Sequence, residues 1–403
     1  MVKATLPKGW RIVRLGSIFA EQTETNCTDL ELLSVTGNRG IIPRSEIEDK
    51  DNSSEDKRKY LKVCKGDIAY NTMRMWQGVS ALSEYNGIVS PAYTVLKPKD
   101  SVSAKFFAYF FKLPHTIFQF YRNSQGLVDD TRNLKYKNFA KISVSIPPLP
   151  EQRAIAEILT TTDKLIAIKE HFITIKQNQK QWLMKNLLTR KRKLSKFNEK
   201  WKTLKLREIC DFISDGDWIE SKDQSNDGYR LIQVGNIGIN EYIDKSKSAR
   251  FISEDTFIRL HCTEVLCGDV LLSRLPDPIG RSCLIRELIS RAITAVDCTI
   301  IRFKTVLLAE LFVQYASTNM YFSKIAKLSG GSTRTRIGRK EIENLLLCIP
   351  MTLPEQKAIA DILTTADREI ELLKKELEQQ KLIKKYIMQQ LLTGKIRVKG
   401  IIP

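Results

Sequence analysis

The stretch LPEQRAIAEILTTTD at residues 149–163 returns almost unchanged as LPEQKAIADILTTAD at residues 353–367. Twelve of the fifteen positions are identical, and the offset between the copies is a constant 204 residues. The repeats of solenoid proteins recur about every 20–50 residues, so this spacing indicates a duplicated domain instead. The chain of 403 residues is therefore predicted to be two copies of one unit with pseudo-two-fold symmetry. Such symmetry suits a ligand with two half-sites, and DNA is the familiar example.

The charge balance also favours a polyanionic partner. Lysine and arginine number 65 against 46 acidic residues, which gives a net charge of +19. Each phosphate that such a surface neutralises releases condensed counterions and so favours binding. A basic protein without such a partner is the alternative. The apolar fraction of 42% is enough for packed cores in a chain of this length.

Several function classes are disfavoured by what the sequence lacks. No run of about 18 apolar residues could span a membrane, and the opening MVKATLPKGW lacks the apolar core of a signal peptide. The eight cysteines form no C-x-x-C pair, which predicts free thiols in a reducing cytoplasm and no metal site. The chain has no G-x-x-x-x-G-K-[ST] phosphate loop and no Asn-Pro pair, and its three histidines are scattered. We therefore expect no catalytic residues.

Each copy begins with a globular body. A tryptophan opens a short amphipathic stretch, at Trp10 and again at Trp201. Short apolar runs then predict strands, while residues 106–120 and 307–328 have helical spacing and length. The body closes with KISVSIP in the first copy and NLLLCIP in the second, each typical of a strand ended by proline. The predicted fold class is therefore α/β, in the sense of mixed α+β, and duplicated.

Each copy ends with a long helix. Pro150 and Pro354 stand at its start, where a missing N–H costs little. Apolar residues then recur at steps of four and three, which indicates a heptad seam and an antiparallel coiled-coil pair. The alternative is that each helix packs on its own body, but the narrow seam favours the pair. The seam positions are Ile155, Leu159, Thr162, Ile166, Lys169, Ile173, Lys176, Lys180, Leu183 and Leu187, then Ile359, Leu363, Ala366, Ile370, Leu373, Leu377, Gln380, Lys384, Ile387 and Leu391.

With these motifs the chain resembles, over nearly its whole length, the specificity subunit of Type I restriction-modification systems. The resemblance is carried by the repeated P-x-x-E-Q-x-x-I-A-x-x-L block and by LLTG at residues 391–394. It is also carried by segments of the bodies, namely GDI at 66–68, NTMRMWQG at 71–78, GDVLLSR at 268–274 and GGSTR at 330–334. The first copy departs from the last of these motifs and has GLVDDTR at residues 126–132.

The resemblance implies an architecture and a set of partners. Two target-recognition domains each read one half of a bipartite, asymmetric DNA target, and the helices act as a ruler for the unread spacer. Two adenine-N6 methyltransferase subunits dock along the helices, and translocase-nuclease subunits join them. S-adenosylmethionine, ATP and Mg²⁺ are expected only on those partners. The implied segments are a first recognition domain at 1–148, a conserved helix at 149–194, a second recognition domain at 195–352, and a second helix with a tail at 353–403.

The candidate DNA-binding residues are planar donors, because arginine reads guanine and asparagine or glutamine reads adenine. In the first body they are Arg39, Asn71, Arg74, Trp76, Gln77 and Arg132. In the second body they are Arg274, Arg281, Arg334 and Arg336, with Ser332 and Thr333 as phosphate donors. Two alternatives remain open: Trp76 and its neighbouring methionines fill the domain's own core, or the arginines form surface salt bridges.

The helices also carry apolar residues that the seam does not use, and a partner helix could cover them. We expect such docking at Ile158, Ile362, Leu372 and Leu382. For the basic run at residues 190–193, phosphate contact and a solvated linker both remain open. Two rival functions are a basic coiled-coil scaffold that binds RNA or another polyanion without base readout, and a nuclease or methyltransferase, which the absent motifs disfavour.

Overall fold

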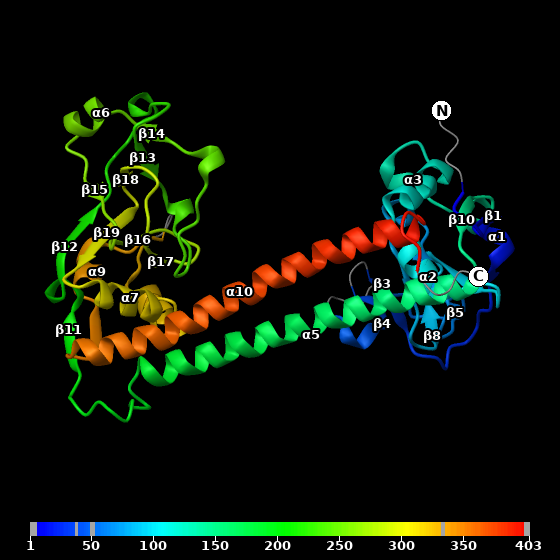
Figure 1. Cartoon of the computed structure of the whole chain (residues 1–403), viewed down its shortest axis with the longest axis horizontal. Coiled ribbons are helices and arrows are strands. Elements are labelled where there is room, and N and C mark those ends of the chain that lie inside the picture. The colour runs from blue at the N-terminus through cyan, green and yellow to red at the C-terminus, as the bar shows by residue number, and fades with distance from the viewer. Residues whose placement is uncertain (1–5, 37–38, 49–52, 332–334, 399–403) are drawn as a thin grey trace. The chain divides into compact units, whose positions relative to one another are not determined.

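The computed structural model describes residues 6–36, 39–48, 53–331 and 335–398, and it divides into two compact units. Unit 1 comprises Met1–Glu170 and Glu376–Pro403, and unit 2 comprises His171–Lys375. The two long helices, α5 (Leu149–Leu187) and α10 (Leu353–Leu392), contribute to both units (Figure 1). Each unit therefore contains one predicted recognition body together with a segment of each helix.

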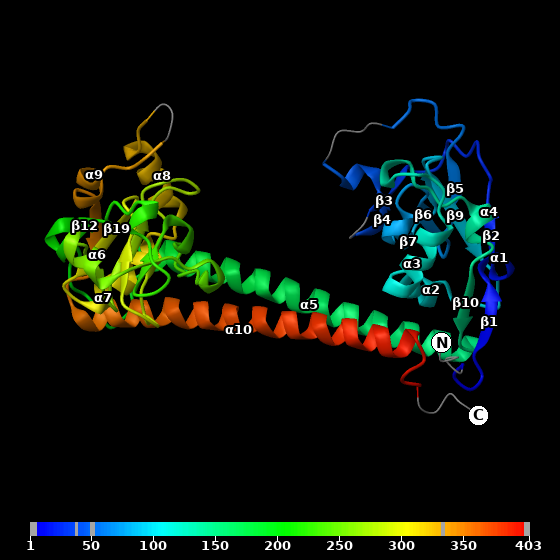
Figure 2. The same cartoon turned by 90° about the horizontal axis from the view of Figure 1, so that it is seen from above.

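The body of unit 1 is built on a four-stranded antiparallel sheet in the order β2-β9-β6-β7 (Figure 2). Three antiparallel strand pairs, β3–β4, β5–β8 and β1–β10, complete it. Its elements are β1 (Arg11–Arg14), α1 (Leu15–Ile18), β2 (Phe19–Gln22), β3 (Leu33–Thr36), β4 (Gly40–Pro43), η1 (Arg44–Glu46), β5 (Leu61–Val63), β6 (Ile68–Asn71), η2 (Met75–Gln77), β7 (Ser80–Leu82), β8 (Gly87–Val89), β9 (Tyr93–Pro98), α2 (Ala104–Phe110), α3 (Pro114–Asn123), η3 (Asp129–Thr131), α4 (Tyr136–Phe139) and β10 (Ser143–Ile146).

The body of unit 2 contains an equivalent sheet, β12-β19-β16-β17, and a second four-stranded sheet, β14-β13-β18-β15. The strands β11 and β20 pair as β1 and β10 do. Its elements are β11 (Lys202–Lys205), η4 (Leu206–Glu208), β12 (Cys210–Asp215), η5 (Ser221–Asp223), β13 (Tyr229–Ile232), η6 (Val234–Asn236), η7 (Ser246–Ser248), β14 (Phe251–Ile252), α6 (Glu254–Arg259), β15 (Glu264–Val265), β16 (Val270–Ser273), β17 (Ser282–Leu284), β18 (Ala292–Thr294), β19 (Cys298–Phe303), α7 (Val306–Tyr315), α8 (Asn319–Leu328), α9 (Arg339–Glu343) and β20 (Leu346–Ile349).

The two bodies therefore share a plan, and the predicted mixed α+β class is confirmed. The stretches predicted as single helices at 106–120 and 307–328 are each two helices. Pro114 begins α3 because a proline is favoured at the first position of a helix. Thr318 caps the start of α8, because its hydroxyl accepts a hydrogen bond from the backbone N–H of Tyr321 at 3.2 Å.

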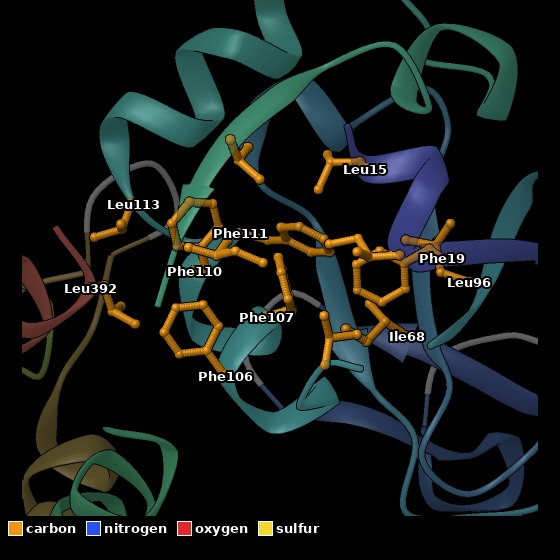
Figure 3. Packing of buried hydrophobic residues seen from close by; sticks show 14 of the residues in the cluster. Leu15, Phe19, Ile68, Leu96, Phe106, Phe107, Phe110, Phe111, Leu113 and Leu392 are labelled. Carbon is orange, nitrogen blue, oxygen red and sulfur yellow. The ribbon is translucent and has the colours of Figure 1, made fainter. Parts of the chain in front are cut away.

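The core of unit 1 is rich in phenylalanine. Phe106, Phe107 and Phe111 are completely buried beside Phe19, and Leu392 from the end of α10 lies in the same cluster (Figure 3). Burying each such side chain contributes about 1.5–3 kcal/mol. The end of α10 is therefore part of the hydrophobic core of the first body.

The predicted helix seam is confirmed at all twenty positions, each of which is buried or half-buried. Within each unit the segments of α5 and α10 lie side by side and run antiparallel (Figures 1 and 2). Lys169 pairs with Glu376 at 2.6 Å in unit 1, and Lys176 pairs with Glu369 at 2.6 Å in unit 2. The alternative of packing on the bodies also holds near the helix ends, since Ile155 belongs to the core of unit 1. Of the helices described, none has the length and apolar character needed to cross a membrane.

Candidate nucleic-acid interface

The loop that follows β6 presents two of the predicted readers to solvent. Arg74 and Gln77 are exposed, whereas Asn71 and Trp76 are half-buried and shape the loop. The Asn71 side-chain oxygen accepts from the backbone N–H of Met73 at 2.9 Å, and the indole N–H of Trp76 donates to the Met73 carbonyl at 2.8 Å. The loop is thus held by its own polar groups while the Arg74 and Gln77 side chains project from it.

The two methionines beside Trp76 show which part of this loop fills the domain core. Met75 is completely buried and belongs to the core cluster of unit 1, whereas Met73 is 41% exposed. Gly78 ends the short helix η2 with a φ of 80°, and a Cβ there would lie 2.7 Å from the Ile117 side chain of α3. The loop therefore packs tightly on α3 at one end and leaves Met73 at the surface.

Trp76 and Arg132, which are far apart in the sequence, meet in the structure. The Arg132 guanidinium lies 4.1 Å from the ring centre of Tyr121 and 5.9 Å from that of Trp76. Phe118 stacks on Tyr121 with ring centres 6.5 Å apart. We call Trp76, Phe118, Tyr121 and Arg132 the aromatic cluster. A guanidinium held over aromatic rings gains cation–π attraction and is fixed in orientation.

Two members of this cluster were not predicted from the sequence. Phe118 and Tyr121 are 54% and 39% exposed, although they lie on a helix that was predicted from its core-like spacing. Their separation by three residues was the available signal, since it places both rings on one face of α3. Exposed aromatic rings beside donors are typical of surfaces that contact nucleic-acid bases.

Arg39 lies apart from this cluster, near the turn between β3 and β4. Its guanidinium pairs with Glu46 at 3.1 Å, and both side chains are about half exposed. This is the surface salt bridge that the sequence analysis left open as an alternative. Such a pair is weak, so Arg39 can still exchange its partner for a phosphate.

Two predicted readers of the second body lie in its interior. Arg274 and Arg281 are 7% and 8% exposed, so neither offers free donors at the surface. Arg274 pairs with Asp215 at 2.5 Å and donates to the carbonyl of Ile337 at 3.0 Å. Arg281 donates to four carbonyl oxygens, those of Val234, Ile237, Leu275 and Pro278, at 2.7–3.1 Å.

These two arginines therefore hold the loop after β16 in shape. A buried guanidinium is tolerated only when its donors are satisfied, and the Asp215 carboxylate and several carbonyl oxygens satisfy them here. Burial lowers the pKa of Arg281, although the group stays charged. Burial argues against base readout by Arg274 and Arg281, and this burial depends on chain segments that the local motif does not contain.

The remaining candidates of the second body lie around Gly330. Arg336 is half-buried, and its guanidinium pairs with Asp297 at 3.1 Å. Gly330 and Arg336 exchange backbone hydrogen bonds of 3.1 and 2.9 Å. Ser332, Thr333 and Arg334 lie outside the described residues, and their predicted role stays a prediction.

Trp218 is an exposed aromatic residue of the second body that the sequence analysis did not select. Its side chain is 71% exposed at the surface beyond β12. The backbone beneath it is fixed, because Gly216 donates to the Cys298 carbonyl at 2.7 Å and Asp217 accepts from the N–H of Thr263 at 2.9 Å. Burial raises the pKa of Asp217. The signal that could have found Trp218 is a lone tryptophan in the polar run SDGDWIE.

The predicted docking residues on the helices divide into two groups. Ile158, Leu372 and Leu382 are 37%, 58% and 65% exposed, as unpartnered apolar positions. Ile362 is half-buried and packs on the apolar cluster around Met184, so most of its surface is already used in unit 2. Helix α5 carries further exposed apolar side chains that were not predicted, namely Leu165, Ile168, Phe172, Ile175 and Trp182.

The described part of the chain holds no group of three or more histidine, cysteine, aspartate or glutamate side chains placed to bind a metal ion. Burial raises the pKa of four thiols to about 12, so these side chains stay protonated: Cys210, Cys262, Cys283 and Cys298. A protonated thiol is a poor nucleophile.

Comparison with known proteins identifies the family of this duplicated architecture. Residues 7–177 and 198–381 each match the Type I restriction modification DNA specificity domain. The specificity subunit of the Type I restriction enzyme MjaVIII from Methanocaldococcus jannaschii is 26% identical over 98% of this chain and 95% of its own length. A putative specificity subunit, MjaX, from the same organism is 27% identical over 87% of this chain and 83% of its own length.

Solved structures share the fold. The HsdS subunit from Thermoanaerobacter tengcongensis aligns with a TM-score of 0.52 at 16% identity, over 98% of this chain and 99% of its own. The S subunit of a Type I restriction-modification system from M. genitalium aligns with a TM-score of 0.57 at 13% identity, over 97% of both chains. A chain from a structural study of complex assembly in a Type I system aligns with a TM-score of 0.61 at 15% identity, over 97% of this chain and all of its own.

The chain belongs to the family of Type I restriction-modification DNA specificity subunits, because two copies of the specificity domain cover most of its length.

Proposed function

We propose that this chain reads a bipartite, asymmetric target in double-stranded DNA, with one half-site for each body. It contributes no chemistry of its own. Two adenine-N6 methyltransferase subunits dock on α5 and α10, and translocase-nuclease subunits complete the assembly. S-adenosylmethionine, ATP and Mg²⁺ act on those partners, and the complex works in the cytoplasm. The observation that carries the proposal is the duplication of a body joined to an antiparallel helix pair, with an irregular loop at the same place in each body.

In the first body the loop after β6 and the aromatic cluster are the proposed reading surface. Arg74 and Gln77 are exposed donors of the types that pair with guanine and adenine edges. The aromatic cluster lies beside them through Trp76, and its half-exposed rings suit contact with bases or deoxyriboses. Arg39 is assigned to a phosphate, because its exposed ion pair can exchange.

In the second body the proposed surface does not use the two buried arginines. Arg274 and Arg281 support the loop after β16, and Trp218 and Arg336 supply exposed or half-exposed groups. The proposed phosphate donors Ser332 and Thr333 and the reader Arg334 keep their assignment from the sequence. Different side chains in the two bodies fit an asymmetric target, because each body then reads its own half-site.

The proposed docking surface for the methyltransferase subunits is the exposed apolar side of the helices. Ile158 and Leu382 contribute to it in unit 1 and Leu372 in unit 2, and the additional exposed residues of α5 are divided between the two units. Large exposed apolar side chains at heptad spacing are typical of helices that await a partner helix. Ile362 is left out of this surface because it packs within unit 2.

The experiment compares Arg74→Ala with Arg39→Ala in cells by sequencing the methylated adenine positions. Arg74→Ala should relax base preference at one half-site, at a cost of about 1–3 kcal/mol, and should leave the other half-site intact. Arg39→Ala should weaken methylation at all targets evenly, as loss of a phosphate contact does. Uniform loss with Arg74→Ala would place Arg74 on the DNA backbone.

The rival function, a basic scaffold that binds RNA without base readout, predicts a different result. Methylome sequencing of the host with and without this chain would then show no bipartite motif that depends on it. Family membership favours the DNA function, and the two equivalent loops give that function a structural basis.

A further inference from the structure

The last residue of the repeated block has a partner on the opposite helix in each unit. In unit 1, Asp163 of α5 forms an ion pair with Lys384 of α10. In unit 2, Asp367 of α10 forms the corresponding ion pair with Lys180 of α5. The offset of 204 residues that relates the two aspartates also relates the two lysines. The same pair therefore occurs twice, and each aspartate closes the stretch that first revealed the duplication.

Each aspartate also binds the recognition body of its own unit. Asp163 accepts a hydrogen bond from the Tyr109 hydroxyl of α2 at 2.7 Å. Burial raises the pKa of Tyr109 to about 12, and the Asp163 carboxylate also acts to raise it. The Tyr109 hydroxyl therefore stays protonated and can donate. Asp163 thus joins three elements of unit 1: its own helix, the opposite helix and the body.

The second body makes the equivalent contact with different residues. Asp367 accepts from the side-chain amide of Gln314 at 2.7 Å and from that of Asn240 at 3.1 Å. Gln314 lies on α7 and is only 3% exposed. The first body therefore provides a phenol to its aspartate, and the second body provides two amides to the equivalent aspartate. We call these two three-way contacts the aspartate junctions.

The lysines explain why a carboxylate is needed at these positions. Lys180 and Lys384 occupy seam positions of the helix pair, where an ammonium group is unfavourable unless it is paired. In a shifted helix register the lysine would lose its carboxylate. The ion pair therefore specifies one register, as single polar seam residues do in coiled coils. The hydrogen bonds from the body attach the body to that register.

The junctions contribute positional accuracy more than stability. The side chains of Asp163 and Asp367 are 39% and 33% exposed, and a cavity of about 480 Å³ beside Tyr109 and Lys384 admits solvent. Ion pairs that solvent reaches contribute little to stability. Removing one should leave the unit folded on its apolar contacts but widen the small rotations of the body that those contacts allow.

We infer that the aspartate junctions are positioning sites, which hold each recognition body at a fixed angle to the helix pair and so restrict the spacer length accepted between the two half-sites. The inference rests on the proposed bipartite DNA function. It assigns a role to Asp163, Asp367, Lys180 and Lys384 that is separate from base contact.

The test uses the full complex in the host cell, with methylome sequencing as the readout. Asp163→Asn keeps an acceptor for Tyr109 but removes the ion pair, and Lys384→Met removes the same pair while leaving an apolar seam. Each variant should methylate targets with a spacer one base pair longer or shorter at least tenfold more often than the unaltered chain, with both half-site sequences kept. Asp367→Asn and Lys180→Met should act likewise.

Asp361→Asn is the matched control, since Asp361 pairs with Lys357 on its own helix at 2.9 Å. It should keep the single spacer. The inference would be overturned if variants at Asp163 and Lys384 also keep the single spacer. It would also be overturned if Asp361→Asn broadens the accepted spacer lengths as much as they do, or if the variants lose base preference within a half-site. If the unaltered chain directs no bipartite motif, the proposed function itself fails, so the two failures are distinguishable.

Discussion

In unit 1 the Arg397 guanidinium donates two hydrogen bonds of 2.6 and 2.8 Å to the Glu151 carboxylate. Glu151 stands in the first turn of α5, and its side chain is only 3% exposed. A third donor of Arg397 reaches the carbonyl of Lys8 at 2.7 Å. The segment after α10 therefore ties the start of α5 to the first residues of the body. In unit 2 the equivalent Glu355 accepts instead from the indole N–H of Trp201 at 3.0 Å.

Replacing Arg397 with methionine should lower the free energy of unfolding of unit 1 by about 2–4 kcal/mol, because Glu151 would keep a buried charge without its cation. Chemical denaturation of the full chain measures this. Lys193 stands 204 residues earlier and is exposed, so Lys193→Met is the matched control and should change the stability by less than about 0.5 kcal/mol. Equal effects of the two substitutions would contradict the role given to Arg397.

The side-chain oxygen of Gln380, at another seam position, is in the opposite situation. It is buried and has no hydrogen-bond partner among the described residues. Lys176, the equivalent residue of the other helix, has Glu369 at 2.6 Å. Gln380→Leu should therefore raise the free energy of unfolding by about 1 kcal/mol, because it removes an unsatisfied group from an apolar seam. Gln379→Leu at the exposed neighbouring position should give no gain in the same denaturation experiment.

The helices could be predicted almost completely from the sequence, and the DNA interface only in part. The seam follows from the local repeat of residues such as Ile155 and Leu159, and a local pattern survives whatever the rest of the chain does. Arg274 shows why the interface is harder. Its location depends on Asp215 and on the carbonyl of Ile337, which stands 63 residues further along the chain. A motif cannot reveal whether long-range packing will bury an arginine.

Because Arg274 is buried, Arg274→Ala should affect stability more than base preference. The substitution leaves Asp215 without its cation and the Ile337 carbonyl without its donor, so unit 2 should lose about 3–5 kcal/mol of stability. Thermal unfolding and limited proteolysis of the full chain would show this. Arg336→Ala, at a half-exposed ion pair, should cost less than about 1 kcal/mol. A stable Arg274→Ala variant with relaxed base preference would restore the reading role that burial argues against.

The last prediction concerns the helices as a ruler. Insertions at Thr160 or Thr162 would disturb the contact of Tyr109 with α5, so the better site lies where the two units divide. Four residues inserted after Glu170 and four before Glu376 keep every cross-helix ion pair within its own unit. The addition lengthens each helix by about 6 Å and shifts the seam by about 40°, which a coiled coil can absorb.

At about 3.4 Å per base pair, this extension corresponds to one or two base pairs of DNA. The double-insertion variant should keep both half-site sequences but methylate targets whose spacer is longer by one or two base pairs, as read by methylome sequencing in cells. An insertion in α5 alone is the control. It prevents the two units from keeping their helix registers together, so either the Asp163–Lys384 pair or the Asp367–Lys180 pair is lost. This variant should lose methylation or accept several spacers without a defined increment. Full activity of the double-insertion variant at the original spacer would mean that α5 and α10 do not set the distance between the half-sites.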